Sequence, residues 1–118
     1  MVQIPLEAHV NQQFMVVLDE QDCTIALYQR GRRMYCDLTV GSEAVCNGAI
    51  ILGGVGIVRV AQNVFSGQLY MVDSLSGDGK KQHAPQWEEL GSRYLLFYAT
   101  ADEQEEIEDY LFEEALNG

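Results

Sequence analysis

Basic residues are scarce in this sequence of 118 residues. Lys and Arg together number 7 against 18 Asp and Glu, which gives a formal net charge of −11. Binding to nucleic-acid backbones depends on Lys and Arg side chains that neutralise phosphates. The composition therefore argues against nucleic acid as the partner and favours another protein.

The sequence also lacks an apolar run long enough to cross a membrane. Its longest apolar stretch, residues 49–60, contains three glycines and Arg59 and falls short of the roughly 18 apolar residues that a spanning helix needs. The amino-terminal residues show no basic segment followed by an apolar run and a cleavage site. We therefore expect no membrane partner, no export by a signal peptide, and synthesis in a cytoplasm.

Cysteine is sparse, and its spacing fits no known framework. Cys23, Cys36 and Cys46 are an odd number, and no two Cys or His residues lie close enough in the sequence to suggest a zinc site. A cysteine nucleophile with His9 or His83 as its base would lack the local signature of such sites. We predict buried, reduced thiols, no cofactor or metal, and no enzymatic activity.

Short apolar segments separated by turn residues fill most of the chain and predict an antiparallel β domain. The predicted strands are residues 13–18, 24–29, 34–40, 44–52, 57–60, 68–72 and 94–98. The last of these is almost wholly apolar, which predicts a central position in its sheet. The loop over residues 74–92 is the longest, and long ordered loops are often functional. The fold class expected is mainly β, a small antiparallel β-barrel or β-sandwich formed by residues 1–100.

The periodicity changes after Thr100 and predicts a carboxyl-terminal amphipathic, acidic α-helix over residues 101–118. Thr100 followed by Glu103 fits a capping box. The predicted apolar stripe of this helix includes Ile107, Tyr110, Leu111 and Phe112. Eight acidic residues between 102 and 114 repel one another, so the helix needs a surface on which to bury its stripe. That surface is either the β body or a neighbouring subunit, and we favour the neighbour.

Two loops carry candidate protein-interface residues. Arg30, Arg32 and Arg33 fall on one predicted turn, where they are either solvated or paired with carboxylates of a neighbouring subunit. The long loop carries two lysines and a tryptophan among acidic residues, which favours a protein contact over a nucleic-acid patch. With the helix stripe, the candidate interface residues are Arg30, Arg32, Arg33, Lys80, Lys81, Trp87, Ile107, Tyr110, Leu111 and Phe112.

Four local patterns occur in order along the chain: Ile4-Pro5-Leu6, Asn11-Gln12-Gln13-Phe14, Gly67-Gln68-Leu69-Tyr70-Met71-Val72-Asp73 and Leu90-Gly91-Ser92-Arg93-Tyr94-Leu95-Leu96-Phe97-Tyr98. Together they resemble the cyanophage-type baseplate plug family. The resemblance covers about residues 2 to 100. It implies a small β-rich virion protein without catalysis, present in several copies where the tail tube of a contractile phage meets the baseplate hub.

The hypothesis that follows is a structural plug or adaptor of a contractile tail baseplate. Its expected partners are other phage tail proteins, namely tail tube, hub and baseplate wedge, and copies of itself in a ring. It would be made in the host cytoplasm and stabilise the tail before contraction. The competing hypothesis is an acidic inhibitor that mimics DNA and blocks a host nucleic-acid enzyme, which the acidic carboxyl-terminal segment favours. The apolar stripe and the modest charge of the rest of the chain argue against it.

Overall fold

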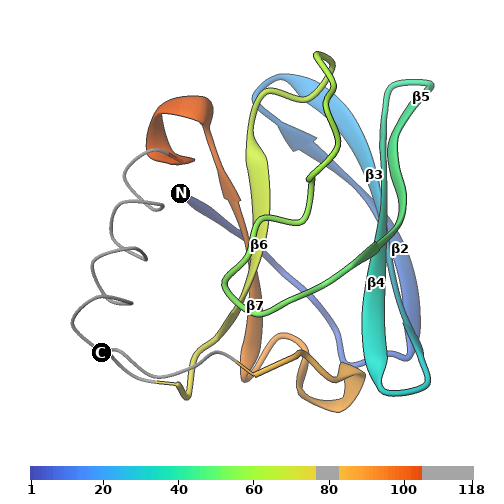
Figure 1. Ribbon diagram of the computed structural model, residues 1–118, viewed down its shortest axis with the longest axis vertical. Helices are drawn as coiled ribbons and strands as arrows, with labels where there is room; N and C mark the ends of the chain where they lie inside the picture. Colours follow the sequence, from blue (N-terminus) through green and yellow to red (C-terminus); the bar gives the residue numbers. More distant parts are fainter. Residues whose placement is uncertain (77–82, 105–118) are drawn as a thin grey trace.

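The computed structural model describes residues 1–76 and 83–104. Its elements are β1 (Val2–Ile4), β2 (Asn11–Leu18), β3 (Gln21–Arg30), β4 (Arg33–Val40), β5 (Glu43–Ile50), β6 (Gln68–Asp73), the short 3-10 helix η1 (Trp87–Glu89) and β7 (Tyr94–Ala99). The strands form two antiparallel sheets, with the orders β1–β7–β6 and β2–β3–β4–β5 (Figure 1). The mainly β class predicted from the sequence is confirmed.

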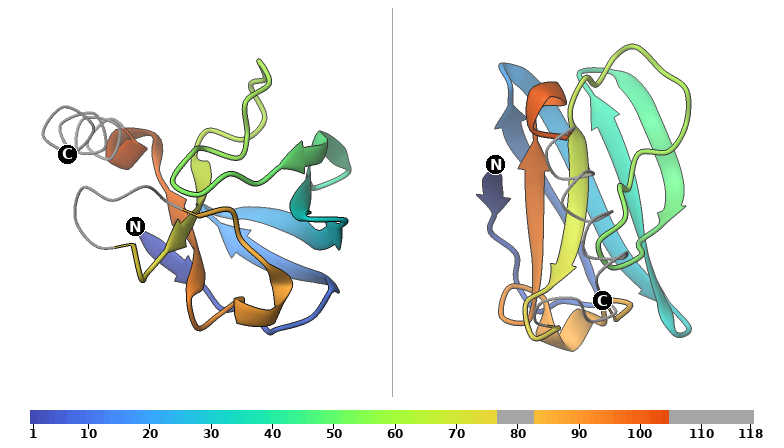
Figure 2. Two further views of the ribbon diagram at one scale, coloured as in Figure 1. Left: turned by 60° about the horizontal axis from the view of Figure 1, so that its bottom comes forward. Right: turned by 60° about the vertical axis from the view of Figure 1, so that its left-hand side comes forward.

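The two sheets face each other and share one core (Figure 2). Strict alternation along β3 and β4 directs every second side chain inward, because successive side chains of a strand point to opposite faces. The fully buried side chains of both sheets include Ile25, Leu27, Met34, Leu38, Leu69, Met71 and Leu96. Each such side chain stabilises the fold by about 1.5–3 kcal/mol relative to an exposed one.

The β2–β3 hairpin is tighter than the sequence predicted. Leu18 pairs with Gln21, so only Asp19 and Glu20 form the turn, and both have positive φ, 51° and 64°. This is the geometry of a type I′ turn, whose twist matches that of the flanking strands. Both strands therefore extend further than the predicted residues 13–18 and 24–29.

The predicted strand over residues 57–60 is wrong. Residues 51–67 form no β-strand. They make a single β-bridge pair, in which Gly56 lies antiparallel to Tyr70 of β6. The side-chain amide of Gln68 accepts from the N–H of Val58 and donates to its C=O, at 2.8 Å each. One glutamine thus satisfies the backbone groups that a neighbouring strand would otherwise bind. A Cβ on Gly56 would lie 2.6 Å from this amide.

Strand β1 was not predicted, whereas the central position of β7 is confirmed. β1 pairs with β7 through Val2–Ile4. After β1, the backbone at Leu6 passes close to the backbone at Gly91. A Cβ on Gly91 would collide with the carbonyl oxygen of Leu6. Gly91 also has a φ of 85°, which favours glycine.

The capping box at Thr100 is confirmed. The N–H of Thr100 donates to Glu103 Oε1 at 3.1 Å, and the N–H of Glu103 donates to Thr100 Oγ1 at 3.3 Å. Residues 101–104 form the first helical turn, and Gln104 Nε2 donates to the carbonyl of Ser66. The amino group of Met1 contacts Glu103. The remainder of the predicted helix, with Ile107, Tyr110, Leu111 and Phe112, lies outside the described residues.

Candidate protein interface

The predicted arginine turn lies at one end of the four-stranded sheet. Arg30 and Arg33 form the closing pair of the β3–β4 hairpin, and Gly31 supplies the positive φ of 62° that the turn needs. Arg30, Arg32 and Arg33 are all exposed. In the part of the chain that the structure describes, none of them forms an ion pair. The turn therefore presents three unneutralised positive charges to solvent or to a partner.

Trp87 lies beside this turn, although it is far from it in the sequence. Gln29 Nε2 donates to Gln86 Oε1 at 2.9 Å, and Gln86 Nε2 donates to the carbonyl of Arg32 at 2.9 Å. Gln29 Oε1 accepts from the N–H of Trp87 at 3.0 Å. This glutamine network holds the backbone of Trp87 next to the arginine turn and joins two of the segments singled out from the sequence. The half-buried Trp87 side chain packs against the hydrophobic core.

A tyrosine pair extends the basic turn over the outer face of the sheet. The rings of Tyr28 and Tyr35 stack with centroids 6.0 Å apart, and the Arg30 guanidinium lies 5.2 Å from the Tyr28 ring centroid. Tyr28 donates to Asp37 Oδ1 at 2.9 Å, and the same oxygen accepts from the N–H of Gly48 at 2.6 Å. Burial and the bond to Asp37 raise the pKa of Tyr28, so the phenol stays a neutral donor. We call Tyr28, Arg30, Arg32, Arg33, Tyr35 and Trp87 the basic–aromatic end.

The structure describes four of the ten predicted interface residues. Arg30, Arg32, Arg33 and Trp87 come together at the basic–aromatic end. The positions of Lys80 and Lys81, like those of the helix stripe, lie outside the described residues.

Arg93 belongs to an interior ion pair that the sequence did not predict. Its guanidinium binds the fully buried carboxylate of Asp73. Hydrogen bonds from Arg93 hold the pKa of Asp73 well below its usual range. Arg93 is therefore a structural residue that fixes the start of β7 against the end of β6.

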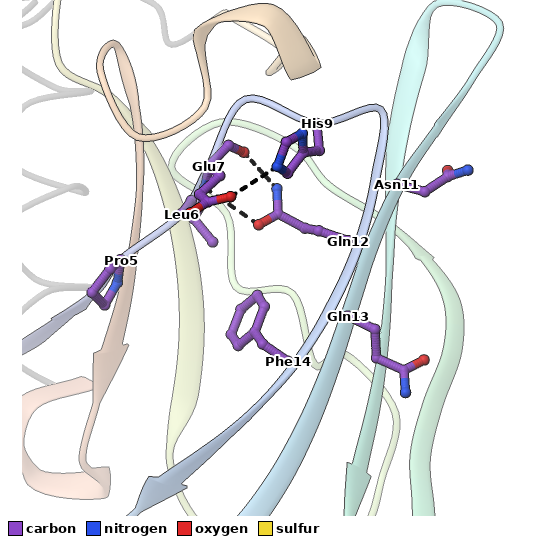
Figure 3. A pocket seen from close by; sticks show the side chains of 8 residues that line it. All are labelled: Pro5, Leu6, Glu7, His9, Asn11, Gln12, Gln13 and Phe14. Carbon is purple, nitrogen blue, oxygen red and sulfur yellow. Dashed lines mark hydrogen bonds and ion pairs between the residues drawn. The ribbon is translucent and has the colours of Figure 1, made fainter.

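A shallow hollow lies where the chain passes from β1 to β2 (Figure 3). Glu7 Oε2 lies 2.8 Å from His9 Nε2, and the Gln12 amide bonds the backbone of Glu7. Half-buried Leu6 and Phe14 belong to its apolar part. The lining thus consists of one exposed Glu–His contact, three amide side chains and three apolar side chains, Pro5 included. The polar groups of Glu7, His9 and Gln12 bond to one another within this segment.

The three cysteines are buried free thiols, as predicted. A hydrogen bond between Cys36 and Cys46 lowers the pKa of Cys46 to about 7 and raises that of Cys36. Within residues 1–76 and 83–104, no three side chains of His, Cys, Asp or Glu gather as a metal site. No helix in the same ranges is long and apolar enough to cross a membrane.

Two facing antiparallel sheets with an exposed arginine turn at one end define a small, mainly β protein. The chain belongs to the family described as cyanophage baseplate Pam3 plug gp18, whose model matches residues 1–102 of 118. The resemblance found in the sequence is thereby confirmed. Baseplate plugs are structural, so the protein has a structural role in a phage tail baseplate and contacts other baseplate proteins. A search of curated proteins finds no match to this chain.

Proposed function

We propose that this protein is a plug or adaptor at the junction of tail tube and hub, where copies of it form a ring and stabilise the baseplate before contraction. The observation that carries the proposal is the basic–aromatic end. Its arginines are exposed and form no ion pair with any described residue, and the glutamine network links the backbone of Arg32 to that of Trp87. Aromatic residues and arginine are enriched in protein interfaces.

The partner surface for the arginine turn should be acidic. The chain itself carries an acidic segment, with eight acidic residues between positions 102 and 114. We place this segment of one copy against the arginine turn of the next. Guanidinium and carboxylate groups form paired, charge-assisted hydrogen bonds. A head-to-tail contact of this kind generates a ring when the rotation closes.

Residues 1–100 would then act as the packing body and residues 101–118 as the arm that reaches a neighbour. The capping box at Thr100 fixes the start of the helix, whose first turn still contacts the body through the bond from Gln104 to the carbonyl of Ser66. Ile107, Tyr110, Leu111 and Phe112 would bury their apolar side chains on that neighbour, and Lys80 and Lys81 would add contacts from the long loop. Charged contacts are weakened by salt, so ring assembly should weaken as ionic strength rises.

The mechanical role requires contacts that hold the pre-contraction state more tightly than the contracted one. A protein shifts such an equilibrium only by its differential affinity for the two states. Ion pairs between the arginine turn of one copy and the acidic segment of the next would meet this requirement. They form at one distance between neighbouring copies, and a rearranged baseplate would separate the paired charges.

The test is the copy number of the protein in purified virions, measured by quantitative mass spectrometry. Wild-type protein should be present in multiple copies, and Arg32→Glu/Arg33→Glu should reduce incorporation by about tenfold, the effect of about 1.4 kcal/mol. Ser42→Glu, in the exposed turn at the other end of β4, is the control and should be incorporated normally. Absence of the wild-type protein from intact tails would overturn the proposal.

A further inference from the structure

Among the strands that the structure describes, β2 is an edge of the four-stranded sheet and pairs with β3 alone. The type I′ turn makes Leu18 and Gln21 a hydrogen-bonded pair, so the even-numbered residues of β2 bond to β3. The bond from Gln29 N–H to the carbonyl of Val10 continues the same pattern. The backbone N–H and C=O groups of the odd-numbered residues, Asn11 to Val17, therefore point away from the sheet.

This edge carries none of the usual protection against pairing with another strand. Natural edge strands are kept apart by charges, proline, bulges or short length. β2 has eight residues, NQQFMVVL, with no charge and no proline, and its ladder with β3 is regular throughout. Its outward side chains include Met15 and Val17, which are 76% and 65% exposed. Figure 3 shows neighbouring side chains of β2, Gln13 and Phe14, on opposite faces.

The sheet is also charged oppositely at its two ends. Asp19, Glu20 and Asp22 lie at the end where β2 stops, and all are exposed. The arginine turn lies at the end where β2 starts, because Asn11 pairs with Tyr28 near the end of β3. An antiparallel neighbour of the same sequence would place its acidic end beside the basic end of the first copy. A parallel neighbour would bring like charges together.

We propose that β2 pairs antiparallel with β2 of a second copy of this chain across a two-fold axis, joining the two four-stranded sheets into one. The register that aligns all the outward-facing residues sets Asn11 opposite Val17 of the partner copy and Gln13 opposite its Met15. Phe14 then lies at the axis. This register forms the most hydrogen bonds that the odd-numbered residues allow. It also gives Met15 and Val17 cross-strand neighbours.

The pairing goes beyond the proposed ring contact. A two-fold contact is self-complementary and closes on itself, whereas the contact between arginine turn and acidic arm is head-to-tail. The two-fold pair is the state of the free protein, in which the exposed edge is covered. Its test is therefore separate from the virion test, and each can fail while the other succeeds.

The first experiment measures the molar mass of the purified full-length protein by light scattering over a dilution series. Wild-type protein should approach twice the monomer mass at high concentration. Met15→Lys places a charge on the edge, and Met15→Pro removes an N–H that the β2–β3 ladder does not use. Both should raise the dimer dissociation constant at least about tenfold. Val60→Lys, at a 54% exposed position outside the named strands, should dimerise as wild type does.

The second experiment tests direction and register by cross-linking. Equal amounts of Asn11→Cys and Val17→Cys are mixed and oxidised mildly, and the disulfide-linked species are identified by mass spectrometry. The antiparallel pair predicts linkage between the two different variants in preference to linkage within either. A wild-type protein that remains monomeric overturns the proposal, as does normal dimerisation by Met15→Lys. Preferential linkage of each variant to itself does so too.

Discussion

The carboxylate of Asp73 and the guanidinium of Arg93 form a two-pronged contact, with Nε to Oδ1 at 2.8 Å and Nη2 to Oδ2 at 3.0 Å. The carboxylate is wholly buried, whereas a quarter of the arginine side chain reaches solvent. The pair joins the end of β6 to the residue before β7. It thus fastens two neighbouring strands of the three-stranded sheet at the point where the long loop enters and leaves.

This pair should make stability depend on pH in the acidic range. Because Arg93 lowers the pKa of Asp73 in the folded state, the carboxylate stabilises the fold above its unfolded-state pKa of about 3.9. That contribution is lost as the pH falls further toward the folded-state pKa. Asp73→Asn should lower the melting temperature by several degrees at neutral pH and flatten its decline on acidification. Thermal melts at stepped pH, with exposed Asp22→Asn as the control, measure this. Parallel curves for Asp73→Asn and wild type would contradict it.

Two glycines with positive φ should respond differently to substitution by alanine. Gly31 and Gly91 have φ of 62° and 85°, but a Cβ on Gly31 meets nothing within 4 Å, whereas one on Gly91 meets Leu6. Gly31→Ala should cost about 1–2 kcal/mol of unfolding free energy from backbone strain alone. Gly91→Ala should cost more, because the β1–β2 segment must move. Urea denaturation distinguishes the two, and equal losses would refute the steric argument.

Removing the cap at the start of the terminal helix should loosen its first turn. Thr100→Ala deletes the oxygen that accepts the Glu103 N–H, and loss of such a cap costs about 0.5–2 kcal/mol. Amide hydrogen exchange at Glu103 should quicken by roughly 2- to 30-fold, the range that this free energy implies. Thr100→Ser keeps the hydroxyl and should exchange like wild type. Unchanged exchange in Thr100→Ala would show that the cap does not hold the turn.

The cysteines should contribute packing and no chemistry. Single replacement of Cys23, Cys36 or Cys46 by Ala should leave incorporation into virions unchanged and reduce stability by about 1–3 kcal/mol. The losses should be largest at Cys23 and Cys36, which are fully buried. A variant that melts like wild type yet fails to enter virions would reveal a functional thiol.

Local alternation was enough to predict most of the strands. β3 and β4 bury every second residue between short turns. The alternation of apolar residues in their sequences therefore matches the alternation of buried side chains in the core. The same pattern failed for residues 57–60, where Ile57 and Val58 are apolar and buried. There the backbone of Val58 is satisfied by the distant side chain of Gln68, a contact that no local period reveals. β1 escaped prediction because three residues before a proline are too few to show alternation.

Four of the six residues of the basic–aromatic end were predicted as interface residues, but the closeness of Trp87 to the arginine turn was not predicted. The arginine turn is contiguous in the sequence, so its charge was visible at once. Trp87 joins it only through Gln29 and Gln86, which are 57 positions apart. The edge position of β2 was also hidden, because its alternation of inward and outward side chains is shared by central and edge strands of a sheet with one solvent-facing side.

The Gln68 amide has a consequence for how relatives of this protein can evolve. It occupies the space beside Gly56 that any side chain would need, and it holds the backbone of Val58. A substitution at position 56 would displace the amide and leave Val58 without its partner, and one at position 68 would free the space but lose both bonds. Positions 56 and 68 should therefore change together across the family. Sequences that keep glycine at 56 should keep glutamine, or a residue of like reach, at 68.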